Sequence, residues 1–110
     1  MLRFNEYRVV WILVLFDLPT ETKIQRKAHA KFRKNLLKDG FSMFQFSIYL
    51  RHCLSNENAD VHTKRVKLFL PNSGNICILR ITDKQFGMME LYSGLDKTDL
   101  PEISQQLEFF

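Results

Sequence analysis

The amino-acid sequence predicts one mixed α+β domain, and three observations support this fold class. A short apolar run at residues 9–16 is rich in β-branched and aromatic residues and ends just before Pro19, as in a strand buried on both faces. The next stretch, residues 20–39, has neither proline nor glycine and is typical of a helix. Two more strand-like segments, separated by a second helical segment, complete the order strand, helix, strand, helix, strand.

The first predicted helix begins at Thr20, its N-cap, and ends before Gly40. An apolar stripe at i+4 spacing should pack on the sheet, and it consists of Ile24, Ala28, Phe32 and Leu36. The opposite side carries five lysines within about 80° of one another, with Arg26 and Arg33 on its flank. We call these five residues the lysine ridge: Lys23, Lys27, Lys31, Lys34 and Lys38.

The lysine ridge has two interpretations. Lysines commonly form a solvated helix face, but such faces usually mix both signs of charge, and only Glu21 and Asp39 offset the charge here. Because like charges along one line repel one another, a phosphate-binding surface is favoured. Residues 1–55 also hold ten Lys or Arg against four Asp or Glu, whereas residues 56–110 hold six against eight. This asymmetry indicates a polyanionic partner for the first half of the chain.

The segments after Gly40 alternate between strand and helix patterns. Period-2 alternation over residues 43–51 predicts either one long bent strand or a very short hairpin. Its apolar face would consist of Phe44, Phe46, Ile48 and Leu50. A second helix is expected from a cap at Ser55 or Asn56 to about Leu70. One side of that helix would carry Val61, Arg65 and Leu68.

The last third of the chain contains shorter elements. Residues 76–82 are apolar and β-branched, and residues 82–85 form a capping-box sequence for a short helical turn. A brief strand is expected at residues 90–93, followed by a polar linker at residues 94–101. Residues 107–110 would form a final strand that pairs with an edge in the same subunit or in a partner.

This order of elements predicts a ferredoxin-like βαββαβ sandwich with both helices on one face of the sheet. The other face, carrying Trp11, Tyr49 and phenylalanines, must then be covered by a second subunit or stack on nucleic-acid bases. A dimeric enzyme or scaffold and an RNA-recognition module are therefore two function classes. The second is disfavoured, because Met43 occupies the position of a stacking aromatic in the RNA-recognition pattern.

Asp17 is the candidate catalytic residue. It directly follows the first predicted strand and precedes Leu18-Pro19. A carboxylate at a strand end can hold a cation against a phosphate, but an Asp before such a turn can also be a turn former. Both interpretations stay open from the residue alone. The potential zinc ligands lack the local spacing of zinc sites; they are His52, Cys53, His62 and Cys77.

Length and composition limit the remaining classes. At 110 residues the chain is expected to form one domain. Two cysteines and an apolar content of 45% are ordinary for an intracellular protein, so the cytoplasm is the expected compartment. The apolar run at residues 9–16 is too short to span a bilayer, and an Asp and a Pro follow it where a signal peptide has small residues. We expect neither secretion nor a membrane anchor.

Several short segments in a fixed order resemble a known family. They are Phe16-Asp17-Leu18-Pro19-Thr20, Arg26-Lys27-Ala28 to Phe32-Arg33, Gly40-Phe41, Gln45-Phe46-Ser47-Ile48-Tyr49, Gly74-Asn75-Ile76 and Thr82-Asp83-Lys84-Gln85-Phe86. Together they are similar to CRISPR-associated protein 2, the small subunit of the CRISPR adaptation module, in the form found in type II systems. The resemblance covers about residues 7–93. Residues 1–93 should then form the ferredoxin-like domain, and residues 94–110 a linker and an extra strand that packs on the dimer.

The resemblance implies a homodimer in which Asp17 of each subunit faces its counterpart, so that Asp17 is both the catalytic residue and the Mg²⁺ ligand. Members of the family are described as metal-dependent endonucleases on RNA or duplex DNA, and as a bridge between two dimers of the CRISPR integrase. We therefore expect a spacer-acquisition subunit with nuclease activity that binds duplex nucleic acid through seven basic residues. These are Lys23, Arg26, Lys27, Lys31, Arg33, Lys34 and Lys38. The alternative is a non-catalytic DNA-binding scaffold in which Asp17 is structural.

Overall fold

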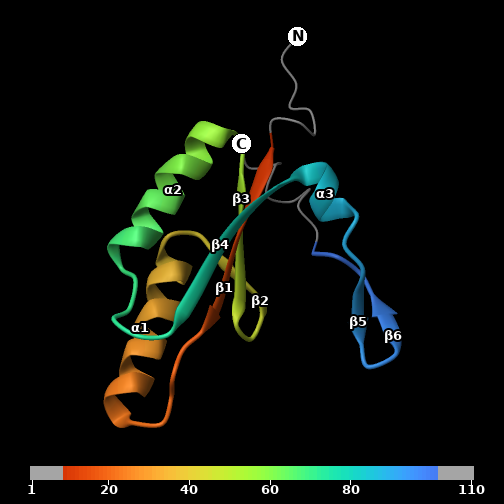
Figure 1. Ribbon diagram of the computed structural model, residues 1–110. Coiled ribbons are helices and arrows are strands. Elements are labelled where there is room, and N and C mark those ends of the chain that lie inside the picture. The colour runs from red at the N-terminus through yellow and green to blue at the C-terminus, as the bar shows by residue number, and fades with distance from the viewer. Residues whose placement is uncertain (1–8, 102–110) are drawn as a thin grey trace.

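A computed structural model describes residues 9–101, which form a four-stranded antiparallel sheet, a two-stranded sheet and three helices (Figure 1). The elements are β1 (Val10–Asp17), α1 (Lys23–Lys38), β2 (Ser42–Gln45), β3 (Ile48–Cys53), α2 (Asn56–Leu68), β4 (Asn75–Thr82), α3 (Asp83–Gly87), β5 (Leu91–Ser93) and β6 (Asp96–Thr98). The larger sheet has the order β2-β3-β1-β4, with α1 and α2 on one side (Figure 1). This arrangement confirms the predicted ferredoxin-like α+β sandwich.

Strand β1 is central and pairs with β3 and β4, so that Leu13 lies between Leu50 and Leu79. Its side chains alternate between the two faces of the sheet. The even-numbered ones, from Val10 to Phe16, pack in the core beneath the helices. The odd-numbered ones, Trp11, Leu13 and Leu15, pack on the opposite face. Packing on both faces explains why the apolar run of β1 is continuous.

The face without α1 and α2, which we call the open face, is covered at one end. There Phe86 of α3 stacks on Trp11 with 3.9 Å between ring centroids, and the indole Nε1–H of Trp11 donates to Asp83 Oδ1 at 2.8 Å. Trp11 is therefore buried, although the sequence placed it on an uncovered face. Toward the other end of the sheet, Leu79 is 46% exposed and Cys77 is also exposed.

The N-cap of α1 is Thr22, which corrects the predicted Thr20. Thr22 Oγ1 accepts a hydrogen bond from the Gln25 main-chain N–H at 3.1 Å. In return, Gln25 Oε1 accepts from the Thr22 N–H at 3.0 Å. This reciprocal pair satisfies two main-chain donors that a start at Thr20 would leave without these partners.

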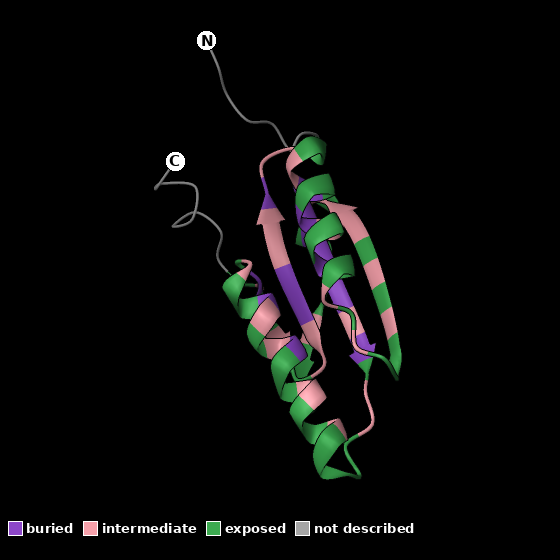
Figure 2. Cartoon of the chain, turned by 90° about the vertical axis from the view of Figure 1, so that its left-hand side faces the viewer, coloured by how far each residue is buried: buried purple, intermediate pink, exposed green. Residues whose placement is uncertain are grey.

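The apolar stripe of α1 packs only along part of its length. Phe32 and Leu36 are buried and Ala28 is half-buried, as predicted, whereas Ile24 is 81% exposed. The outer surface of the helix is exposed along its whole length (Figure 2). At the other end the chain reverses at Gly40, whose φ of +91° favours glycine.

Strands β2 and β3 form the very short hairpin, one of the two predicted arrangements, with a turn at Phe46-Ser47. The register shifts between Met43 and Gln45. Tyr49 is fully buried beneath the helices, so its predicted place on the uncovered face was wrong. Phe46 is 69% exposed, although the alternation placed it on an apolar face. The reason is that the turn interrupts the period-2 pattern between the two strands.

Helix α2 begins after Ser55, one of the two predicted caps, whose Oγ accepts from the Asn58 N–H at 3.0 Å. Val61, Arg65 and Leu68 share one side of the helix, as expected, and all three are exposed. The buried side chains are Ala59, His62 and Val66. One of the three buried positions of α2 is therefore occupied by a histidine, where a purely apolar stripe would have an apolar residue.

The segment after β4 contains more structure than predicted. The capping box of α3 at Thr82 and Gln85 and the short strand β5 are both confirmed. The predicted polar linker instead contains β6, which pairs with β5 in a hairpin. The predicted strand at residues 107–110 lies outside the described residues. Among the helices of residues 9–101, none has the length and apolarity to cross a membrane.

Candidate active site and nucleic-acid surface

Asp17 is the last residue of β1, and its side chain is exposed. It pairs in register with Asn75, the first residue of β4. By the alternation of β1, its carboxylate is on the open face, in line with Leu13 and Leu15. The structure therefore places the sequence-predicted residue at the uncovered end of an apolar sheet face.

A shallow hollow of about 370 Å³ surrounds this position. It is lined by Leu15, Phe16, Asp17, Ser47, Ile48, Asn75, Ile76 and Cys77. The main-chain N–H of Phe16 donates to the Ser47 carbonyl oxygen at 3.0 Å. This bond ties the end of β1 to the β2–β3 turn, so the main chain before Asp17 is held on that side.

The loop before β4 holds the other side of Asp17. Gly74 has a φ of +94°, and a Cβ atom there would lie 2.8 Å from the carbonyl oxygen of Asp17 and 2.5 Å from Leu18 Cδ2. Only a residue without a side chain fits this close approach. The main chain of Asp17 is therefore positioned by a contact with a loop more than fifty residues later in the chain.

Within the described part of the chain, Asp17 is the one carboxylate that lines this hollow. Among residues 9–101, no group of three or more His, Cys, Asp or Glu side chains could hold a metal ion. Mg²⁺ is commonly held by one or two carboxylates with water and substrate phosphate oxygens. The chemistry of Asp17 therefore fits Mg²⁺ if a second copy contributes its own carboxylate.

The lysine ridge lies on the outer surface of α1, and all five of its lysines are exposed. None of them forms a salt bridge with the carboxylates of residues 9–101. The two flanking arginines have structural contacts as well. Arg26 Nη1 donates to the carbonyl oxygens of Thr20 and Glu21. Arg33 Nε donates to the Tyr49 hydroxyl at 2.7 Å.

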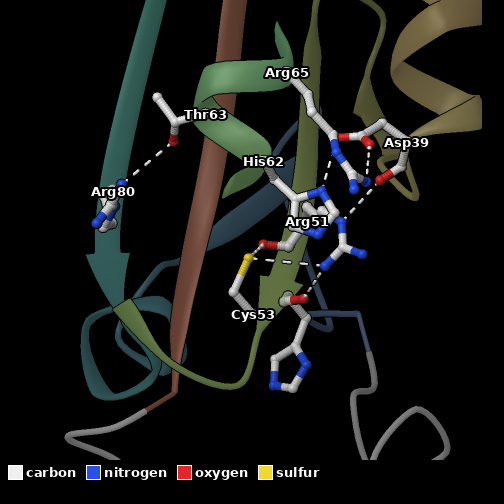
Figure 3. Close-up of polar contacts among 8 residues, drawn as sticks. Asp39, Arg51, Cys53, His62, Thr63, Arg65 and Arg80 are labelled. Atoms are coloured by element: carbon white, nitrogen blue, oxygen red, sulfur yellow. Dashed lines mark hydrogen bonds and ion pairs between the residues drawn. The ribbon is translucent and has the colours of Figure 1, made fainter. Parts of the chain in front are cut away.

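A polar cluster around Asp39 was not predicted as a unit (Figure 3). The Asp39 carboxylate accepts hydrogen bonds from His62 Nδ1 at 2.8 Å and from Arg65 Nη1 at 3.1 Å. The main-chain carbonyl oxygen of Asp39 accepts a hydrogen bond from Arg51 Nε at 2.9 Å. The cluster ties the C-terminal end of α1 to α2 and β3, at the opposite end of α1 from Asp17. Its members are far apart in sequence, and the only local signal was an acidic residue at the helix end.

Residues 10–89 match the family model for CRISPR associated protein Cas2. The chain belongs to the Cas2 family. The match includes Asp17, the lysine ridge and the Gly74 loop, and it ends before β5. Similar proteins called CRISPR-associated endoribonuclease Cas2 include one from Flavobacterium psychrophilum, which is 61% identical over 98% of this chain and 94% of its own length.

Two other Cas2 relatives cover similar shares of the chain. The one from Parvibaculum lavamentivorans is 48% identical over 92% of this chain and 100% of its own length. The one from Paracidovorax avenae is 39% identical over 94% of this chain and 96% of its own length. Both are named CRISPR-associated endoribonuclease Cas2. These matches extend past β5 and β6, so the family resemblance covers nearly the whole chain.

Proposed function

We propose that the chain is a CRISPR-associated endonuclease that hydrolyses phosphodiester bonds in RNA or DNA as a homodimer. The observation that carries this proposal is the position of Asp17, an exposed carboxylate at the end of a partly uncovered apolar face. The relatives named endoribonuclease support the reaction class. We further propose that it is a cytoplasmic subunit for spacer acquisition with a CRISPR integrase as partner.

The open face supports the dimer. Leu15 and Ile48 are only half-buried and Leu79 is 46% exposed on that face, so a second copy would remove a contiguous apolar surface from water. A two-fold axis near the end of the face would bring the two Asp17 carboxylates together. The partner would then supply a second carboxylate beside that of Asp17.

Asp17 would act as the ligand of Mg²⁺ in this dimer. The ion, when bound, polarises the phosphoryl group and lowers the pKa of a coordinated water. The chain itself supplies the charge that retains the ion and the loop contact at Gly74 that fixes the main chain of Asp17. Two carboxylates at one axis repel one another unless a cation or proton lies between them. Mg²⁺ should therefore also strengthen the dimer.

The lysine ridge favours a second role in binding duplex DNA. Five exposed lysines without carboxylate partners in residues 9–101 would neutralise phosphates along one side of a duplex and release counterions. A scaffold that bridges two integrase dimers needs this surface but not the carboxylates. The two roles are compatible, because the ridge and Asp17 are separate features of the chain.

The experiment that tests the nuclease is Mg²⁺-dependent cleavage of labelled single-stranded RNA and duplex DNA. Asp17→Asn keeps the shape of the side chain and removes its charge, and Asp96→Asn in β6 is a control at another exposed aspartate. We expect cleavage to be lost in Asp17→Asn alone, with circular dichroism and oligomeric state unchanged. Equal cleavage by wild type and Asp17→Asn, or none by wild type, would leave the DNA-binding scaffold as the function.

A further inference from the structure

Phe46 is an exposed aromatic residue that the fold does not explain. It occupies the turn between β2 and β3 and is 69% exposed. Turn positions usually carry Gly, Asn, Asp, Ser or Pro, because these residues suit the backbone and the solvent. A phenylalanine contributes little to the core from this position. The ring therefore has a role other than packing in the core.

Two nitrogen-containing side chains of α1 border the ring. The imidazole of His29 stacks against Phe46 with 6.0 Å between ring centroids and 25° between planes. The guanidinium of Arg33 lies over the ring, with Cζ at 5.8 Å from its centroid. The hydrogen bond from Arg33 Nε to the Tyr49 hydroxyl, at 2.7 Å, holds the guanidinium in place. No carboxylate of residues 9–101 pairs with Arg33.

The ring is at the same end of the sheet as Asp17. Ser47, the neighbour of Phe46, accepts the main-chain hydrogen bond of Phe16 and lines the hollow around Asp17. The Phe16 ring contacts His29, with 5.9 Å between centroids. Phe16 points beneath the helices and Asp17 to the open face. A strand of nucleic acid that passes around this end of the sheet would meet both Phe46 and Asp17.

We propose that Phe46, with His29 and Arg33, is a stacking platform for an unpaired nucleobase of a single-stranded nucleic acid. The proposal rests on the proposed nuclease function. Aromatic rings bind unpaired bases of any sequence because every base has a π face, and a nearby guanidinium adds stacking and donors for phosphate or base oxygens. A base inside a duplex has both faces covered by its neighbours. The platform therefore selects single-stranded over duplex substrate.

The side chains around Phe46 also make a protein partner less favoured than a nucleotide at this position. An apolar partner side chain on the ring would also cover Arg33, whose charge has no carboxylate partner within residues 9–101. Covering an unpaired charge costs free energy. A nucleotide supplies both an aromatic base for the ring and a phosphate for the guanidinium. The chemistry of the platform thus matches a nucleotide better than an apolar peptide.

The test measures binding of a short single-stranded RNA that carries 2-aminopurine, in buffer with EDTA so that no cleavage occurs. Stacking quenches 2-aminopurine fluorescence, which gives a readout independent of nuclease activity. We expect Phe46→Ala to bind about tenfold more weakly, since one stacked base contributes about that factor or more. Phe46→Trp should retain both quenching and affinity, and binding to a duplex should be unchanged in both variants.

Met43→Ala is the matched control, because Met43 is 54% exposed on the same hairpin. Equal single-strand binding by Phe46→Ala and Met43→Ala would overturn the proposal. So would an equal loss of single-strand and duplex binding, or a change of oligomeric state without a change of binding. Because the assay contains no metal, a Phe46 effect would persist even if Asp17→Asn and wild type cleaved equally. Failure of the platform and failure of the nuclease are therefore distinguishable.

Discussion

Gly74 lies against the main chain of Asp17, so closely that a Cβ atom on Gly74 would stand 2.8 Å from the Asp17 carbonyl oxygen. The residue before β4 therefore determines where the end of β1 can lie. Since the Asp17 carboxylate extends from this same main chain, the contact positions the candidate ligand without touching its side chain.

Gly74→Ala should lower both stability and cleavage. The new methyl group would push against the main chain at Asp17, and the φ of +94° is strained for alanine, which together cost about 2 kcal/mol or more. Urea unfolding and the cleavage assay measure the two effects. Gly94→Ala is the control, because its φ of +63° is also positive but no atom lies within 4 Å of its added Cβ. Equal losses in the two variants would show that the contact with Asp17 is unimportant.

Neutralising three ridge residues should weaken duplex binding and its salt dependence. The variant Lys27→Gln, Lys31→Gln, Lys34→Gln removes three charges from one exposed line. The slope of log affinity against log salt should decrease by up to about 0.9 for each lost phosphate contact. The control variant carries the same change of net charge at three exposed lysines outside the ridge: Lys64, Lys67 and Lys84. An unchanged slope in the ridge variant, or the same decrease in both, would contradict the assignment.

Asp39→Ala should destabilise the protein far more than Asp60→Ala. Asp39 has a side-chain exposure of 10% and holds His62, whose side chain is 7% exposed. Removing this carboxylate leaves a buried donor unpaired, at a cost of about 2–4 kcal/mol. Asp60 pairs with Arg80 but is 59% exposed, so its loss should cost less than about 1 kcal/mol. Chemical unfolding of both variants measures the difference, and similar values would refute the buried role of Asp39.

His52 should make the protein less stable in acid. Burial lowers the pKa of His52 below its ordinary value of 6.5, while Asp83 raises it and Arg51 lowers it by smaller effects. The unfolded chain then binds the proton at a higher pH than the folded chain. Stability should therefore fall as the pH decreases below about 6.5.

His52→Gln tests this pH dependence, because glutamine does not titrate. Unfolding in urea at about pH 7.5 and about pH 5 gives the loss of stability for each protein. The loss should be smaller in the variant than in wild type. The His52 ring lies beside Trp11, with 4.9 Å between ring centroids, so the substitution also changes packing. Because the loss is the difference between two pH values within one protein, this packing effect cancels. An equal or greater loss in His52→Gln would show that His52 does not contribute.

The strands and helices were largely predictable because their signals are local. The apolar run of β1, the capping box at Thr82 and Gln85, and the glycine after α1 each depend on a few neighbouring residues. Packing sides were harder to predict. Tyr49 was misplaced because Phe44, Ile48 and Leu50 pack on the open face, which leaves the opposite side of β3, with Tyr49, beneath the helices. His62 was not expected inside because its partner Asp39 is 23 residues away.

For the candidate site as well, the local signal could be read from the sequence and the long-range contacts could not. Asp17 could be chosen from the end of an apolar strand followed by a turn. The contacts that position it could not, because Gly74 and Ser47 approach it only through the folding of distant segments. The surroundings of Phe46 depend in the same way on His29 and Arg33 of α1, which precede it by more than ten residues.

The most direct test of the account is the number of metal ions bound per chain. Mn²⁺ prefers the same oxygen ligands as Mg²⁺, and its binding can be titrated by electron paramagnetic resonance on wild type and Asp17→Asn. Two carboxylates that share one ion at a dimer axis predict one Mn²⁺ for every two chains, with binding lost in Asp17→Asn. One ion for each chain, or undiminished binding in Asp17→Asn, would contradict a shared site.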